Sequence, residues 1–202
     1  MMAAMGGAQQ LPLSLCDYPE LMKRAVNICA EVFAEIWNAQ HELIPSSPQG
    51  YMSGTFRLWA PHKIAWLQAD AMALLSPALY REFFLPVDRR LCRQLPVVAF
   101  HLHDSALWGV DKLTAIDELA VFELGFDATP GAEEDTFEAC KRAQRLKPLI
   151  IWRMYQPDQF WPWLDQVLRE LSPAGLSIQI TVADAAAAKE VVSGFMKKAR
   201  AL

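Results

Sequence analysis

The sequence predicts an α/β protein built from about five parallel strand–helix units. From residue 97 onward, short apolar segments alternate regularly with helical patterns. This rhythm indicates a parallel sheet, because the chain needs a crossover, usually a helix, before it can form the next parallel strand. The segment 149–152 is apolar at every position, which is typical of a strand covered on both faces.

The first part of the chain predicts one long helix and one strand. Residues 1–10 carry little pattern, and we expect them to be disordered. Residues 19–40 form a helix with Asp17 as its N-cap. Apolar residues recur along it at helical spacing: Leu21, Ala25, Ile28, Val32, Ile36 and Trp37. Residues 44–50 form a loop, and residues 63–68 form a strand that leads to Asp70.

The remaining elements follow in a regular order. Ser76 is a good N-cap and Pro77 suits the first helical position, so a helix begins there and continues to residue 95. The later strands are expected at 97–103, 119–126, 149–153 and 176–182. The helices that follow them are expected at 106–116, 133–146, 157–171 and 184–200.

The composition excludes several classes of protein. Hydrophobic residues make up 53% of the chain and charged residues 21%, which excludes a disordered chain. The net charge of -4, without a basic block, argues against nucleic acid and anionic membranes as partners. The apolar runs are too short to span a bilayer, and residues 1–7 do not form a secretory signal. Four cysteines without CxxC spacing indicate small buried thiols in a reducing cytoplasm.

The strand 97–103 ends in two histidines and is followed by a carboxylate. Residues i and i+2 of a strand point to the same face, so His101 and His103 are expected to lie side by side. Two buried imidazoles need a metal, an acidic substrate or a role in proton transfer to compensate them. The alternative is that both rings are hydrogen-bonded to neighbouring carboxylates. Asp104 either orients one of the rings or caps the helix that follows.

Polar residues stand at the carboxyl ends of several predicted strands. They are Asp70, His101 with His103, Glu123 with Asp127, Arg153 and Asp184. An open doubly wound sheet and a (β/α)₈ barrel both use the strand–helix rhythm, but polar groups gathered at one rim are typical of barrel enzymes. The chain contains neither GxGxxG nor GxxxxGK[ST], so nothing indicates a dinucleotide or phosphate loop.

Four segments carry a resemblance to a known family. They are LWAP at 58–61, QADAMALLSP at 68–77, YREFFLP at 80–86 and FHLH at 100–103. These segments resemble the C-terminal part of uroporphyrinogen decarboxylase-like proteins, a superfamily that includes corrinoid-dependent methyltransferases and related cobalamin-independent methionine synthases. The resemblance implies that residues 1–202 form one such domain, a partial (β/α)₈ TIM barrel in which the N-terminal units are missing.

The resemblance also implies two chemistries. The decarboxylase branch needs no cofactor or metal. The methyltransferase branch carries a zinc site with the pattern His-x-Cys, a Glu on the next strand and a distal Cys. In this chain His101, His103 and Glu123 match the first positions, with histidine in place of cysteine, and Asp184 is the nearest oxygen ligand. The resemblance thus implies a zinc site made by these four residues.

The expected substrate is a small molecule, either a tetrapyrrole or a methyl donor. Asp70, His101 and His103 are the candidate catalytic residues. Arg153 is a candidate clamp for a substrate carboxylate, with an ordinary salt bridge as the alternative. Tyr51 and Arg57 lie in the loop before the first strand and are candidates to reach the pocket.

The number of strands has a consequence for partners. Five strands cannot close an eight-stranded barrel, so both edges of the sheet would be unpaired. We therefore expect a homo-oligomer, or a complementing subunit that supplies the missing strands. Two functional readings stay open: a cytoplasmic lyase or zinc-dependent methyltransferase, and a non-catalytic fragment or subunit.

Overall fold

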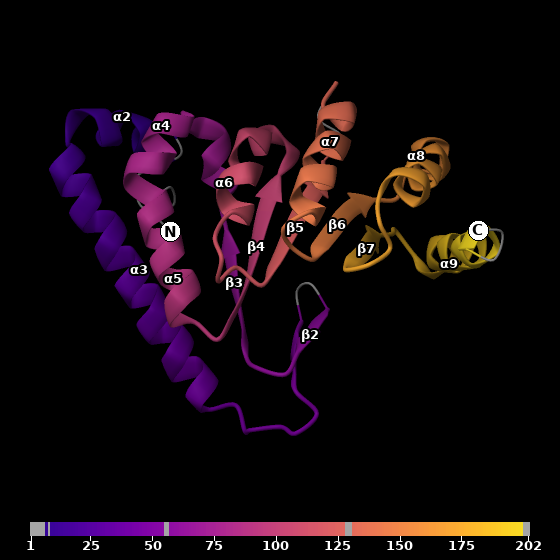
Figure 1. The fold of residues 1–202 in the computed structure, drawn as a ribbon, viewed down its shortest axis with the longest axis horizontal. Coiled ribbons are helices and arrows are strands. Elements are labelled where there is room, and N and C mark those ends of the chain that lie inside the picture. The colour runs from indigo at the N-terminus through magenta and orange to yellow at the C-terminus, as the bar shows by residue number, and fades with distance from the viewer. Residues whose placement is uncertain (1–6, 8, 55–56, 128–130, 200–202) are drawn as a thin grey trace.

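The computed structural model describes residue 7 and residues 9–54, 57–127 and 131–199 (Figure 1). Most of segment 1–10, for which disorder is expected, lies outside these residues. The first described helix begins at Gln10.

From β4 onward the strands and helices alternate as the sequence predicts, except that the helix expected at 106–116 is a 3₁₀-helix, η3 (Asp104–Gly109), followed by the short α6. The α-helices are α2 (Gln10–Asp17), α3 (Pro19–Glu42), α4 (Pro77–Leu79), α5 (Leu85–Gln94), α6 (Val110–Thr114), α7 (Glu133–Gln144), α8 (Pro157–Glu170) and α9 (Ala185–Ala199). The strands are β1 (Tyr51–Ser53), β2 (Leu58–Ala60), β3 (Ile64–Gln68), β4 (Val97–His103), β5 (Val121–Phe126), β6 (Leu149–Met154) and β7 (Leu176–Thr181). Within the described ranges, none of the helices combines the length and the apolar character that a membrane span needs.

Five parallel strands form the main sheet in the unbroken order β3-β4-β5-β6-β7 (Figure 1). Because the order never reverses, right-handed crossovers place the connecting helices on one face. Phe100, Phe122 and Ile151 point to that face and belong to the same core as Phe137 of α7 and Trp163 of α8. The parallel sheet flanked by helices confirms the predicted α/β class, and no closed barrel forms within the described residues.

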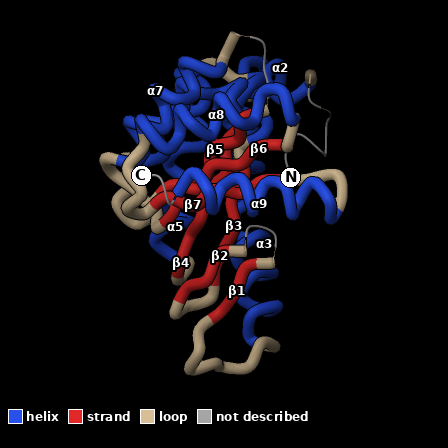
Figure 2. Tube along the Cα trace, turned by 90° about the vertical axis from the view of Figure 1, so that its right-hand side faces the viewer, coloured by secondary structure: helices blue, strands red, loops and turns tan. Residues whose placement is uncertain are grey.

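The opposite face of the sheet carries the two histidines. Its amino-terminal end is covered by the antiparallel hairpin β1–β2, where Ala60 packs on Ile64 and Ala99. Figure 2 shows this hairpin at the end of the molecule away from α7 and α8. The sequence predicts strands that are covered on both faces, and on this side the cover at the amino-terminal end is a short hairpin rather than a helical layer.

The β1–β2 hairpin is not predicted from the sequence. The turn before it needs Gly50, which has a φ of +85° and would place a Cβ atom 2.6 Å from the carbonyl oxygen of Ala60. The indole nitrogen of Trp59 donates to the carbonyl of Gln49. Three-residue strands are too short to show the alternation that identifies a strand.

Helix α3 buries a different face from the one expected. The residues that face the core are Met22, Val26, Ala30 and Trp37. Of the predicted stripe, Trp37 is buried, whereas Leu21, Ile28, Val32 and Ile36 are exposed. The helix thus has two apolar faces, and one of them is largely exposed in the described structure. Asp17 does not cap α3: it ends α2, Tyr18 occupies the cap position, and Pro19 begins α3.

The helical region after Ser76 contains a π-helix. The Oγ atom of Ser76 accepts a hydrogen bond from the amide of Leu79 at 3.2 Å, which confirms the predicted cap. A π-helical segment, η2 (Tyr80–Phe84), then separates α4 from α5. Through this segment the hydroxyl of Tyr80 reaches Asp88 of α5 and donates to its Oδ2 atom at 2.6 Å.

Candidate metal site

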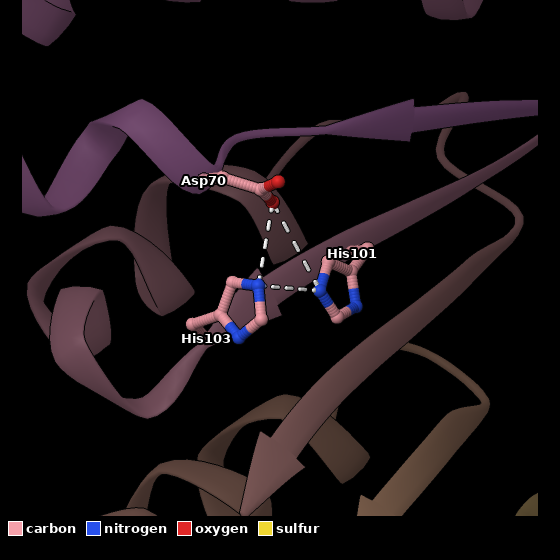
Figure 3. Close-up of side chains that lie close together, drawn as sticks. All are labelled: Asp70, His101 and His103. Atoms are coloured by element: carbon pink, nitrogen blue, oxygen red, sulfur yellow. Dashed lines mark hydrogen bonds and ion pairs between the residues drawn. The ribbon is translucent and has the colours of Figure 1, made fainter. Parts of the chain in front are cut away.

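Two histidines converge at the carboxyl end of β4. His101 and His103 project from the same face of the strand, as the two-residue period predicts. Their Nε2 atoms lie 3.1 Å apart, and their rings meet edge to face with centroids 4.5 Å apart (Figure 3). His101 is buried, and His103 has a side chain that is 33% exposed. The pair therefore faces a site that solvent reaches from the His103 side.

Asp70 completes a group of three possible ligands. It is the first residue of a 3₁₀-helix, η1 (Asp70–Leu74), that begins two residues after β3 ends. Its Oδ1 atom lies 3.4 Å from Nε2 of His103 and 4.0 Å from Nε2 of His101 (Figure 3). The three ligand atoms all lie within 4.8 Å of one another. The parallel register places the ends of β3 and β4 side by side, since Gln68 pairs with His101.

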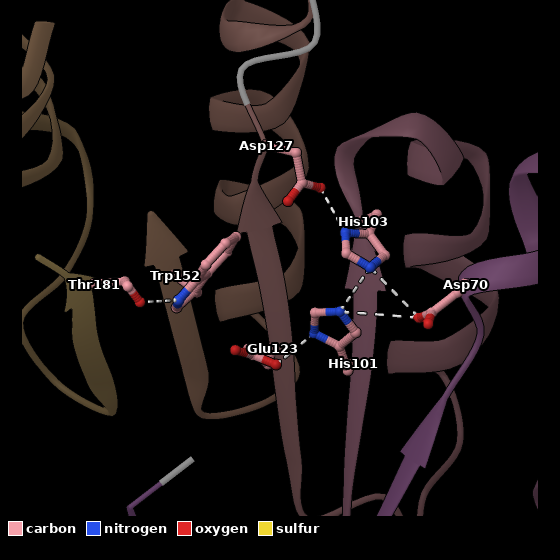
Figure 4. Close-up of polar contacts among 7 residues, drawn as sticks. All are labelled: Asp70, His101, His103, Glu123, Asp127, Trp152 and Thr181. Carbon is pink, nitrogen blue, oxygen red and sulfur yellow. Dashed lines mark hydrogen bonds and ion pairs between the residues drawn. The ribbon is translucent and has the colours of Figure 1, made fainter. Parts of the chain in front are cut away.

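A carboxylate holds each imidazole from behind. Oε2 of Glu123 lies 2.5 Å from Nδ1 of His101, and Oδ2 of Asp127 lies 2.6 Å from Nδ1 of His103 (Figure 4). A carboxylate can only accept a hydrogen bond, so each Nδ1 carries the hydrogen. The Nε2 lone pairs of both rings then point toward each other and toward Asp70. This is the arrangement in which outer carboxylates orient metal-binding histidines.

Asp127 is itself held in place. Its backbone amide donates to Oδ2 of Asp104 at 3.0 Å. Gly125 lies beneath its side chain, where a Cβ atom would come within 3.2 Å of Oδ1 of Asp127. Of the two roles expected for Asp104, this hydrogen bond supports orientation of a ring in an indirect form, because Asp104 positions Asp127, which in turn orients His103.

The electrostatics of the site favour a cation. Two nitrogen lone pairs at 3.1 Å repel each other unless a proton or a metal ion lies between them. Three carboxylates, from Asp70, Glu123 and Asp127, surround the two imidazoles. Burial raises the pKa of Glu123, and the hydrogen bond from His101 opposes that shift. The Oε1 atom of Glu123 is buried without a hydrogen-bond partner among the described residues, so the carboxylate depends on His101 for its compensation.

The predicted site residues are only partly brought together. Asp70, His101 and His103 meet as expected, whereas Glu123 lies behind His101 rather than beside the ligand atoms. Asp184 caps α9, where its Oδ1 atom accepts hydrogen bonds from the amides of Ala186 and Ala187. Asp184 is not in the group of possible metal ligands found among the described residues.

The predicted substrate-binding residues are not among the possible metal ligands of the described structure. Arg153 is buried, donates to Glu133 and Gln159, and stacks over Trp163. It also lines a small cavity of about 160 Å³ next to Asp127. Its role as a clamp for a substrate carboxylate stays a prediction. Tyr51 belongs to β1, where its hydroxyl accepts from the amide of Ser47. Arg57 is exposed in the turn before β2.

Asp127 is the site residue whose role the sequence does not reveal. It follows β5 directly and is therefore one of the polar residues expected at the carboxyl ends of the strands. The sequence does not show that its partner is His103. That pairing depends on the register between β4 and β5, in which His103 lies opposite Gly125.

No protein-family model matches this chain, and no curated protein matches it either. The resemblance to uroporphyrinogen decarboxylase-like proteins therefore stays a hypothesis carried by the quoted segments.

The donor set fits a divalent transition metal. Two imidazoles and one carboxylate are the ligands of many open metal sites, in which further positions are left for water or substrate. Both histidines direct the lone pair of Nε2 toward Asp70, so the metal-binding nitrogen atoms are already oriented before a metal binds. Asp70, with a side chain that is 59% exposed, is the most accessible of the three.

Proposed function

We propose that this chain is a metal-dependent enzyme of the uroporphyrinogen decarboxylase-like type that acts on a small molecule. His101, His103 and Asp70 would hold one divalent transition metal ion, with zinc as the first candidate. The observation that carries the proposal is the 3.1 Å approach of two Nε2 atoms whose Nδ1 atoms are both engaged by carboxylates.

The ligands suit activation of a nucleophile. A metal with three protein ligands lowers the pKa of a bound thiol or water and so supplies a nucleophile at neutral pH, which for a thiol permits methyl transfer. Glu123 and Asp127 keep the two rings oriented and balance the added charge. Because one carboxylate oxygen of Asp70 suffices to hold the metal, its other oxygen is placed to accept a proton from a group bound beside the histidines.

We propose further that the sheet is an open section of a (β/α)₈ barrel. The support is the unreversed strand order, the helices on one face and the polar residues at the carboxyl ends of β3, β4 and β5. Active sites of such barrels lie at this end of the strands. The pocket for the substrate would then open at the same rim, in a cytoplasmic protein whose cysteines form no disulfide.

A second candidate is a subunit that depends on a partner. Within the described residues, β3 and β7 each pair on one side only. Unpaired edges favour pairing with another chain. A homo-oligomer or a complementing subunit would cover these edges, and the metal site would then work only in the assembly.

The decisive experiment is metal analysis of protein purified without chelators, followed by Co²⁺ titration of the metal-free protein. We expect about one metal ion per chain and visible Co²⁺ absorption bands. His101→Ala and His103→Ala should reduce the bound metal to a small fraction. His62→Ala is the matched control, because His62 is exposed and lies outside the group of possible ligands.

Two outcomes would reject the metal. One is a stoichiometry near zero for every transition metal, even after Co²⁺ or Zn²⁺ is added. The other is binding that survives loss of both histidines. Either result would leave the paired imidazoles without a metal, which suits the cofactor-free chemistry of the decarboxylase branch.

A further inference from the structure

A second possible binding site lies next to the metal ligands. A cavity of about 490 Å³ runs beneath α3 and α5 and along the unpaired edge of β3. This volume falls within the range of about 300–1,000 Å³ that is typical of small-molecule sites. Asp70 is part of its wall, whereas His101 and His103 are not.

The wall of the cavity is apolar with a few polar groups. Helix α3 contributes Val26 and Phe33, and the opposite wall includes Phe84, Leu91 and Phe100. The polar groups of the wall are the side chains of Gln68, Asp70, Tyr80 and Asp88, the indole N–H of Trp66 and the thiol of Cys29. Among the described residues of the wall, none is Lys, Arg or His. Carboxyl groups without a basic residue in the wall favour a cationic or neutral ligand over an anionic one.

Asp88 is the polar group that a ligand would meet among the apolar residues. Its Oδ2 atom accepts the hydrogen bond from Tyr80, and no described residue forms a salt bridge with it. Burial raises the pKa of Asp88 to about 7, while the hydrogen bond from Tyr80 opposes the shift. A carboxylate in apolar surroundings is costly unless a cation or further donors compensate it. Its second oxygen is available to accept a hydrogen bond from a ligand.

We propose that this cavity binds a small apolar amine, with its ammonium group donating to Asp88 and its hydrocarbon body packed against α3. An ammonium supplies both the missing positive charge and the missing donor. A neutral alcohol supplies only the donor, and a carboxylic acid would add a like charge. The proposal goes beyond the metal site and does not need it, because neither histidine touches the cavity.

The test uses three probes that share one apolar body: 4-phenylbutylamine, 4-phenylbutanol and 4-phenylbutyrate. Each is titrated into the protein at about pH 8, where Asp88 is ionised, and binding is followed by calorimetry. We expect the amine to bind saturably and most tightly, the alcohol to bind more weakly, and the butyrate not to bind. Asp88→Asn should weaken the amine roughly tenfold or more and leave the alcohol nearly unchanged.

Two further variants keep the test decisive. Ala30→Phe fills the cavity from α3 without removing a carboxyl group, and it should abolish binding of both the amine and the alcohol. Asp117→Asn is the matched control, because Asp117 is exposed and lies outside the wall. Circular dichroism checks that each variant is folded. Amine binding should persist in His103→Ala, which separates this proposal from the one about the metal.

Three results would overturn the proposal. The first is that no probe binds the wild-type protein, as expected if a polypeptide segment fills the cavity. The second is that the butyrate binds as well as the amine. The third is that folded Asp88→Asn keeps the wild-type affinity for the amine.

Discussion

Nδ1 of His103 lies 2.6 Å from Oδ2 of Asp127, a residue that stands just beyond the neighbouring strand. This contact decides which nitrogen of His103 faces the other histidine, because the hydrogen on Nδ1 leaves the lone pair on Nε2. Glu123 does the same for His101 at 2.5 Å. The metal proposal depends on this shared orientation as much as on the ligands themselves.

Removing the charge behind His103 should weaken metal binding without unfolding the protein. Asp127→Asn keeps the shape of the side chain but loses the carboxylate that accepts from Nδ1. Partners of this kind typically contribute about 10–100-fold to metal affinity. We expect a loss in that range by Co²⁺ titration, with a thermal midpoint close to that of the wild type. Asp117→Asn should change neither quantity, and an unchanged affinity in Asp127→Asn would show that the carboxylate does not orient the ring.

Gly125 should act on the metal through Asp127. The Cβ atom of alanine would lie 3.2–3.3 Å from the carboxylate oxygens of Asp127, so Gly125→Ala should push that side chain away from His103. We expect a several-fold loss of Co²⁺ affinity. In the Asp127→Ala background the same substitution should have no further effect, because the group that it displaces is absent. If Gly125→Ala weakens Co²⁺ binding by the same factor in the wild type and in Asp127→Ala, Gly125 does not act through Asp127.

Asp88 should make stability depend on pH in an unusual direction. Its pKa is about 7 in the folded protein, whereas an exposed aspartate has a pKa near 3.8. Between these two values the folded state holds more protons than the unfolded state, so the free energy of unfolding should fall as the pH rises and level off above about pH 7. One proton contributes at most about 1.4 kcal/mol per pH unit.

The measurement for Asp88 is urea unfolding of the wild type and of Asp88→Asn across pH 4–8. The difference between the two proteins isolates Asp88 from Glu123, whose pKa is also raised. Asn keeps an oxygen that accepts from Tyr80 but does not titrate in this range. A difference that is independent of pH would mean that the carboxyl group is well solvated.

The exposed face of α3 should cause self-association. Leu21, Ile28 and Ile36 are each more than half exposed and lie along one side of a long helix. Apolar stripes of this kind mark interaction surfaces. We expect the wild type to associate with increasing concentration in sedimentation velocity, and Ile28→Glu to associate less at every concentration. Glu31→Gln, on the same helix, serves as the control, and a wild type that is monomeric at every concentration would contradict the expectation.

The strands and the histidine pair could be predicted because both depend on local patterns in the sequence. A buried parallel strand is a short apolar run between helical patterns, and the predicted bounds of β4 agree with the structure. The two-residue period then brings His101 and His103 together without further information. Asp70 followed from the rule that parallel strands end at one edge.

The features that could not be predicted depend on contacts between segments that are distant in the sequence or on irregular helix geometry. The face of α3 was predicted incorrectly because both sides of the helix are apolar, and the choice between them is made by α5 and β3. Glu123 was predicted as a metal ligand, and its contact with Nδ1 of His101 depends on the register between β4 and β5, which the sequence does not give. The contact between Tyr80 and Asp88 joins residues eight positions apart, which a regular helix would not bring together through its usual i,i+4 spacing.

The π-helix at Tyr80–Phe84 makes this region sensitive to insertions and deletions. Each residue of a helix advances the chain by about 100° around the axis. Loss of a single residue there would restore ordinary α-helical pairing and rotate all of α5 relative to the segment before it. Asp88 would then turn away from Tyr80. Related proteins that keep the cavity should therefore keep the length of this π-helical segment even where its side chains differ.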